Sequence, residues 1–144
     1  MIWLLRHGDA KAEAADDASR ELTGKGRRQA QAVGGAMRAL GVRLDACLTS
    51  PKVRAKDTAL IACESLNIEP ELTEALRGGD FDPAEVAGVR GEVMLVGHEP
   101  DFSRAVALAT GGRIKLKKGG LVAIDGPELV LVLRPAELAA IAGL

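Results

Sequence analysis

The chain has 144 residues, 47% of them hydrophobic, which suits a single globular domain over residues 1–144 with one substantial core. A formal net charge of −1 and an aromatic content of one Trp and two Phe argue against nucleic acid or an anionic membrane as a partner. Two cysteines form no disulfide framework and no metal-ligand spacing, and no apolar run reaches about 18 residues, so we expect a soluble cytoplasmic protein that makes no membrane contact.

The first strand is expected at the N-terminus, where the apolar run from Met1 to Leu5 leads directly into Arg6-His7-Gly8. Such a strand delivers a histidine to its carboxyl end, the edge at which open α/β sheets bind their ligands. Arg6 offers a planar set of donors suited to phosphate, and Gly8 would let a ligand approach the backbone. Taken alone, the triplet fits a strand end with a solvated arginine and a turn glycine equally well.

The segment from Lys11 to Leu22 is small, charged and aperiodic, and its length predicts a loop that serves as a rim or lid. Thr23 is expected to cap a helix that ends at Gly41. A short strand at 46–49 should follow, and then a helix from Ser50-Pro51 to about Leu66.

Arg54 lies in the first turn of that second helix, where free backbone N–H groups and the helix dipole favour an anion. We expect Val53, Leu60 and Cys63 to face the core. The spacing by itself also allows a solvated helix arginine.

A second apolar run, Glu92 to Val96, ends in Gly97-His98-Glu99-Pro100. Both histidines of the chain therefore follow buried strands, and in a parallel sheet the carboxyl ends of those strands lie on one side, so the two can converge. A structural histidine at a strand end is the alternative.

The last third is predicted to be antiparallel. Arg113 to Lys117 should form a strand, Gly119-Gly120 a two-residue hairpin turn into Leu121–Asp125, and Leu129–Leu133 a third strand before a closing helix from Pro135. We attribute Lys115 and Lys117 to solubility and to the protection of a sheet edge against pairing with other strands.

Four motifs in this order resemble the histidine phosphatase superfamily, and in particular its SixA branch of small phosphohistidine phosphatases: Leu5-Arg6-His7-Gly8-Asp9-Ala10, Leu22-Thr23-x-x-Gly26, Thr49-Ser50-Pro51-x-x-Arg54-Ala55-x-x-Thr58 and Val96-Gly97-His98-Glu99-Pro100. The resemblance implies a phosphoglycerate mutase-like α/β fold, a three-layer α/β/α sandwich with a mostly parallel mixed sheet and an antiparallel C-terminal hairpin.

By the same resemblance His7 is the nucleophile, and Arg6, Arg54 and His98 hold the phosphoryl group together with the backbone of Gly8. Larger relatives place an acidic proton donor in a long insertion that is short here. Asp80, in the Gly-Gly-Asp turn, is the first candidate for this donor, and Glu99 is the second.

The chemistry of these residues is consistent with that resemblance. Cations stabilise the charge on a phosphoryl group in transfer, and Arg6 and Arg54 would also keep His7 neutral, so that it can form a phosphohistidine intermediate without a metal or cofactor. The favoured substrate is a phosphohistidine on a protein, such as a histidine-containing phosphotransfer domain, because a short chain suggests an open site. A phosphatase of small phosphomonoesters and a non-catalytic phosphate-binding module are the alternatives.

Overall fold

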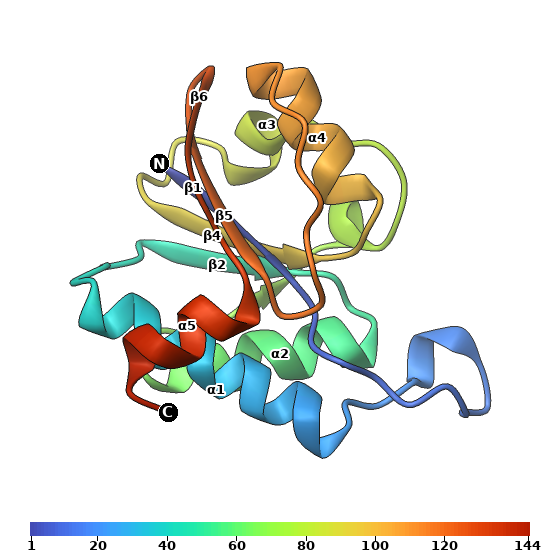
Figure 1. Ribbon diagram of the computed structural model, residues 1–144. Helices are drawn as coiled ribbons and strands as arrows, with labels where there is room; N and C mark the ends of the chain where they lie inside the picture. Colours follow the sequence, from blue (N-terminus) through green and yellow to red (C-terminus); the bar gives the residue numbers. More distant parts are fainter.

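A computed structural model describes all residues, 1–144, and shows one six-stranded sheet between two layers of helices (Figure 1). The strands lie in the order β3-β2-β4-β1-β5-β6. Their bounds are Ile2–Arg6 (β1), Ala46–Thr49 (β2), Glu71–Leu72 (β3), Val93–Gly97 (β4), Leu121–Asp125 (β5) and Glu128–Leu133 (β6). The first four are parallel, whereas β5 runs antiparallel to β1 and β6 antiparallel to β5. The predicted fold class is confirmed.

The helices divide between the two faces of the sheet. One face is covered by α1 (Gly24–Ala39), α2 (Val53–Glu64) and α5 (Pro135–Ala142), and the other by α3 (Pro83–Ala87) and α4 (Asp101–Thr110) (Figure 1). Two short 3-10 turns, Asp17–Ser19 and Glu74–Leu76, complete the elements. None of the helices combines the length and the apolar character that crossing a membrane requires.

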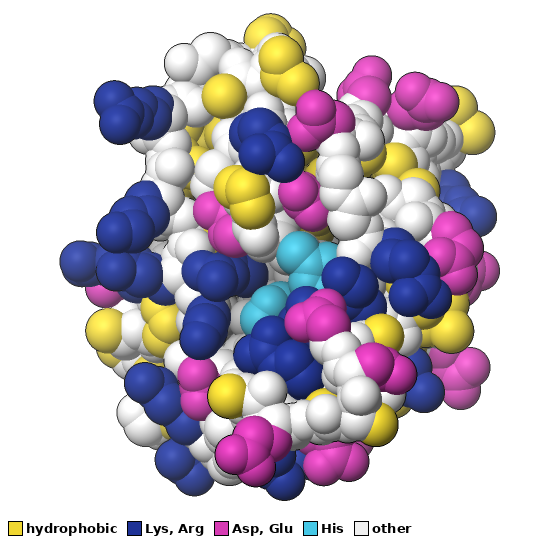
Figure 2. All heavy atoms as spheres, turned by 90° about the vertical axis from the view of Figure 1, so that its right-hand side faces the viewer, with side chains coloured by type: hydrophobic (Ala, Val, Ile, Leu, Met, Phe, Trp, Pro, Cys, Tyr) yellow, Lys and Arg dark blue, Asp and Glu magenta, His cyan; other side chains and the backbone are white.

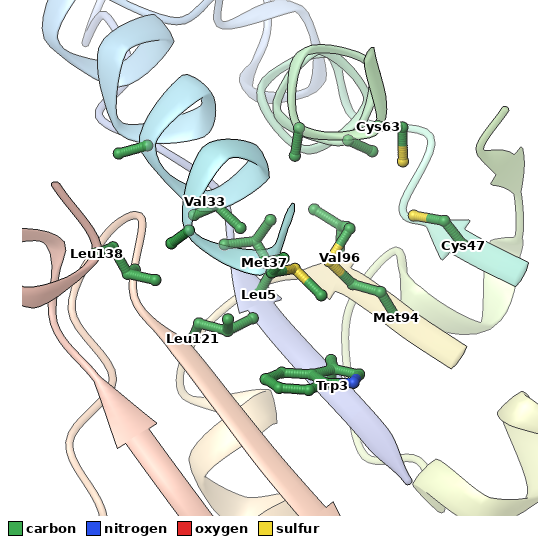
Figure 3. Close-up of a cluster of buried hydrophobic side chains, with 14 of the residues drawn as sticks. Trp3, Leu5, Val33, Met37, Cys47, Cys63, Met94, Val96, Leu121 and Leu138 are labelled. Atoms are coloured by element: carbon green, nitrogen blue, oxygen red, sulfur yellow. The ribbon is translucent and has the colours of Figure 1, made fainter. Parts of the chain in front are cut away.

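The alternation of side chains along β1 builds both cores. Trp3 and Leu5 point towards α1, α2 and α5, as Figure 3 shows, while Leu4 belongs to the cluster on the opposite face. Strands buried on both faces explain the unbroken apolar runs in the sequence. In the parallel pairing of β1 with β4, Arg6 lies opposite Gly97, so the next residue on each strand is a histidine. The register of the sheet therefore places the two histidines side by side.

The start and the inward face of α2 differ from the prediction. The helix begins at Val53 rather than at Ser50, because the Ser50 hydroxyl accepts the Lys52 N–H at 3.2 Å and Ser50-Pro51 forms a turn before it. Its buried face consists mainly of small residues, namely Ala55, Ala59, Ala62 and, as predicted, Cys63, whereas Leu60 is 45% exposed.

Close packing of α2 on α1 explains that preference for small residues. A Cβ added to Gly34 of α1 would lie 2.5 Å from the Ala62 carbonyl oxygen. Two helices that approach this closely leave no room for leucine between them.

The strand predicted at Arg113–Lys117 and its Gly119-Gly120 hairpin are wrong. Residues 113–117 pair with no strand, and the hairpin is formed by β5 and β6 through Gly126, whose φ is 55°. The Gly119 N–H donates to the Arg6 and His7 carbonyl oxygens at 3.1 and 3.0 Å. The 113–118 segment is therefore a loop that closes over the end of β1.

Candidate active site

Both histidines lie at the carboxyl edge of the sheet, with their ring centroids 5.3 Å apart. Each is almost fully buried, with 7% of His7 and 6% of His98 exposed. Figure 2 shows the two rings in a hollow, with Lys and Arg side chains on both sides. The structure thus brings together the two residues that the sequence predicted to converge.

The contacts of His7 fix its tautomer. Its Nδ1 lies 2.7 Å from the Gly8 carbonyl oxygen, which can only accept, so Nδ1 carries the proton and donates it. Nε2 then holds a lone pair and makes no hydrogen bond within the protein. Gly8 is itself held, because its N–H donates to the Thr58 hydroxyl at 3.0 Å and that hydroxyl donates to the Arg54 carbonyl at 2.7 Å.

The surroundings keep both rings neutral. Burial lowers the pKa of His7 to about 4, with help from the charges of Arg54 and Arg6 and against the opposing effect of the Gly8 hydrogen bond. Burial, followed by the proximity of His7 and Arg54, lowers the pKa of His98 to about 3. At neutral pH the free nitrogen of His7 is therefore available as a nucleophile.

His98 has one ring nitrogen that is hydrogen-bonded and one that is not. Its Nε2 lies 2.8 Å from the Ser50 hydroxyl, which already accepts the Lys52 N–H and has no other acceptor for its own proton. Ser50 thus donates to Nε2, and the proton of the neutral ring is on Nδ1. That Nδ1 is buried without any partner.

Arg54 is held along one edge of its guanidinium group by Asp17. Nη1 donates to the Asp17 carbonyl oxygen at 2.8 Å and Nη2 to the Asp17 carboxylate at 3.2 Å, while Nε is buried without a partner. Only 6% of Arg54 is exposed, so it is not a solvated helix arginine. The free edge, Nε and the second proton of Nη2, matches two oxygens of a phosphoryl group.

Asp17 is a site residue that the sequence reasoning missed. Although burial acts to raise the pKa of its carboxyl group, hydrogen bonds from Arg54 and Arg20 lower it to about 2, and Lys52 adds an ion pair at 3.4 Å. In the sequence it was one of several acids in a loop of charged composition. Only its placement on the 3-10 turn beside Arg54 distinguishes it.

Arg6 completes the set of cations. Its Nη1 donates to the Leu116 carbonyl at 3.0 Å, and its Nε is buried without a partner. Three buried nitrogens thus have no partner in the protein, namely Arg6 Nε, Arg54 Nε and His98 Nδ1. An unsatisfied buried donor costs about 1–3 kcal/mol, so each of these groups favours an anion that can accept from it.

Gly8 has a packing role in this structure. A Cβ at Gly8 would lie 2.6 Å from the Gly26 carbonyl oxygen, so the end of β1 and the start of α1 touch backbone to backbone. Its N–H is occupied by Thr58, and it is not free for a phosphate oxygen. Thr23 caps α1 as predicted, since its hydroxyl accepts the Gly26 N–H at 3.1 Å.

The two candidate proton donors lie in different places. Asp80 is 72% exposed and forms an ion pair with Arg104 at 3.0 Å, in a separate pocket against α4, so the structure does not bring it to the histidines. Glu99 lines a pocket together with Arg6, and its carboxylate accepts the Ser103 N–H at 2.7 Å and the Ser103 hydroxyl. No group of three or more His, Cys, Asp or Glu side chains lies close enough to hold a metal ion.

Comparison with known proteins assigns this arrangement to a family. The sequence profile of the histidine phosphatase superfamily (branch 1) matches residues 2–98. The chain belongs to this superfamily. An uncharacterized protein of Picosynechococcus is 31% identical over 137 residues, covering 85% of this chain and 83% of that protein.

Two further matches extend the comparison. The mitochondrial serine/threonine-protein phosphatase Pgam5 of Drosophila ananassae is 37% identical over 70 residues, which are 49% of this chain and only 24% of that longer protein. The structure of the protein histidine phosphatase SixA complexed with tungstate superimposes with a TM-score of 0.82 at 22% identity, over 95% of this chain and 98% of that one. The SixA structure shows that the fold is shared over nearly the whole chain, and the superfamily profile supports a phosphatase.

Proposed function

We propose that this histidine phosphatase hydrolyses phosphohistidine on a protein and that His7 Nε2 is its nucleophile. The observation that carries the proposal is the neutral, unengaged Nε2 of His7 beside buried N–H groups of Arg54 and His98 that have no partner. A non-catalytic phosphate-binding module would need the donors but not a free nucleophile between them.

The reaction proceeds in two steps. The Nε2 lone pair attacks phosphorus and the P–N bond of the substrate breaks. The electron pair of that bond stays on the substrate nitrogen, and the ring leaves as neutral imidazole because its other nitrogen carries a proton. Water then attacks the phosphorus of the phosphorylated His7, which releases phosphate and restores the neutral ring. In both steps Arg6, Arg54 and His98 donate to the peripheral oxygens, where negative charge gathers.

The nature of the leaving group favours phosphohistidine. A serine or sugar alkoxide must be protonated as it departs, and general acid help is worth roughly a hundredfold or more. An imidazole, whose conjugate acid has a pKa of about 6.5, leaves as a neutral ring with little help. Asp80 is engaged elsewhere, and Glu99, which is held by Ser103, is the remaining candidate for the acid that a phosphomonoester would need.

The matches support two substrate classes. SixA, by its printed name a protein histidine phosphatase, shares the fold over nearly the whole chain, which is consistent with phosphohistidine. The similarity to a serine/threonine-protein phosphatase makes phosphoserine or phosphothreonine on a protein the second candidate. Small phosphomonoesters are a third class, with the same need for an acid.

The test compares kcat/KM for a phosphohistidine protein, a phosphoserine peptide and a small sugar phosphate. We expect the first to be preferred, and Glu99→Gln to slow the two phosphomonoesters at least about tenfold more than the phosphohistidine protein. Ser103→Ala is the matched control, because it removes one contact of Glu99 and leaves its carboxyl group in place. A preference for a phosphomonoester, or equal and large losses on all substrates in Glu99→Gln, would contradict the proposal.

A further inference from the structure

A second pocket, of about 530 Å³, adjoins the phosphoryl-binding residues. Its lining includes Arg6, which directly precedes His7, together with Glu99, the first turn of α1 and the 113–118 loop, and the charges of Arg6 and Lys118 both act on His7. Its charged lining residues are Arg6, Asp9, Lys25, Glu99, Lys115, Lys117 and Lys118.

The charge of this pocket departs from that of the whole chain. Five of its lining residues are cations and two are acids, in a protein whose net charge is −1. Among its lysines only Lys118 has an acidic partner, Asp9, at 3.5 Å. Lys25, Lys115 and Lys117 are exposed and form no ion pair. Figure 2 shows Lys and Arg side chains gathered beside the histidines on this face.

The structure removes one of the two explanations given for Lys115 and Lys117, the protection of a sheet edge. Lys115 and Lys117 were attributed to protection of a sheet edge, but their segment is not a strand and the sheet ends at β6. The segment is instead tied to the site, because Leu116 between them is buried and its carbonyl accepts from Arg6. Both lysines are thereby held at the border of the phosphoryl-binding hollow.

We infer that this lysine pocket binds acidic side chains that flank the phosphohistidine on the substrate protein. The inference rests on the proposed function. Because Arg6 lines the pocket and directly precedes His7, residues beside a phosphohistidine that reaches His7 would lie close to the pocket.

The kind of cation favours carboxylates over a second phosphoryl group. Lysine ammonium groups are flexible point charges without the fixed donor fork of arginine, so Lys25, Lys115 and Lys117 suit several dispersed carboxylates. The pocket has a single hydrophobic lining residue, Leu116, and no aromatic one, so it offers no surface for a base or sugar ring. Complementary charge of this type increases mainly the rate of association and the specificity for the partner.

The experiment uses two phosphohistidine proteins that differ only in flanking residues, acidic in one and the corresponding amides in the other. We expect wild type to prefer the acidic substrate by roughly tenfold in kcat/KM at low salt, and added salt to reduce this preference. The double variant Lys115→Glu/Lys117→Glu should abolish the preference, mainly through KM. Arg113→Glu is the matched control, an exposed cation of the same loop that does not line the pocket.

The outcomes separate the pocket from the proposed function. Thermal unfolding of each variant verifies that its fold is retained. Equal kcat/KM of wild type for the two substrates, or the same loss of preference in Arg113→Glu as in the double variant, would overturn the inference and leave the proposed function intact. Failure to hydrolyse either phosphohistidine protein would overturn both.

Discussion

Thr58→Val tests how the buried polar network positions the nucleophile. Thr58 is fully buried, accepts the Gly8 N–H at 3.0 Å and donates to the Arg54 carbonyl at 2.7 Å. Valine keeps the shape of the side chain but leaves the Gly8 N–H without a partner, which costs about 1–3 kcal/mol. For a chain of this size a loss of about 2 kcal/mol lowers Tm by roughly 4–8 °C.

The same substitution should also affect catalysis. Gly8 supplies the carbonyl that holds His7 Nδ1, so a shift of Gly8 turns the ring, and a small misplacement of a reacting group lowers kcat by roughly tenfold to a hundredfold. The assay pairs thermal unfolding with kcat for Thr58→Val and Thr58→Ser. The serine variant keeps the hydroxyl and should keep kcat within about threefold, since it loses only a methyl group worth about 1 kcal/mol. If Thr58→Val matched wild type in both Tm and kcat, the reasoning would be refuted.

Three further predictions concern the charges around the nucleophile. Arg54→Ala should lower kcat about a hundredfold and raise KM, because a preorganised contact worth about 3 kcal/mol is lost; unchanged kcat and unchanged inhibition by vanadate would place Arg54 outside the site. Asp17→Ala should lower kcat about tenfold by removing the carboxylate that accepts from Arg54 Nη2, while the backbone carbonyl of residue 17 still accepts from Nη1, and Asp17→Asn, which keeps a side-chain acceptor, should lose less; equal kcat in wild type and both variants would rule out a positioning role. In an NMR titration, His7 and His98 should show pKa values near 4 and 3. Since these lie below the value of about 6.5 in the unfolded chain, the two residues contribute stability that is present above that pH and is lost as the pH falls towards 4; a pKa above 6 for His7 would contradict the burial argument.

Strands β1, β2, β4, β5 and β6 were predictable from the sequence because local patterns determine them, whereas β3 was not predicted and the strand expected at 113–117 does not form. Apolar runs that end in Arg6-His7 and Gly97-His98 identify buried parallel strands, and parallel strands share their carboxyl edge. Arg54 could be placed near a helix start because Ser50-Pro51 is a local pattern typical of one. The pairing of Arg6 with Gly97 then brings the predicted residues together without further information.

The remaining features depend on contacts between distant segments. The ion pair of Asp17 with Arg54 joins residues 37 positions apart. It depends on a 3-10 turn that no sequence pattern predicts. The contact of Gly8 with Gly26 is visible only when β1 and α1 are placed in space. Lys115 and Lys117 alternate with apolar residues as in a strand, but the bonds of Gly119 to β1 keep that segment out of the sheet.

The central claim is that His7 carries the phosphoryl group, and trapping the intermediate tests it most directly. Wild type mixed with labelled phosphohistidine protein and quenched rapidly without acid should retain label in an acid-labile, base-stable bond, and peptide mapping should locate it on His7. His7→Ala, with its fold verified by thermal unfolding, should retain no label and show no turnover. Label on another residue, or full activity in His7→Ala, would contradict the account.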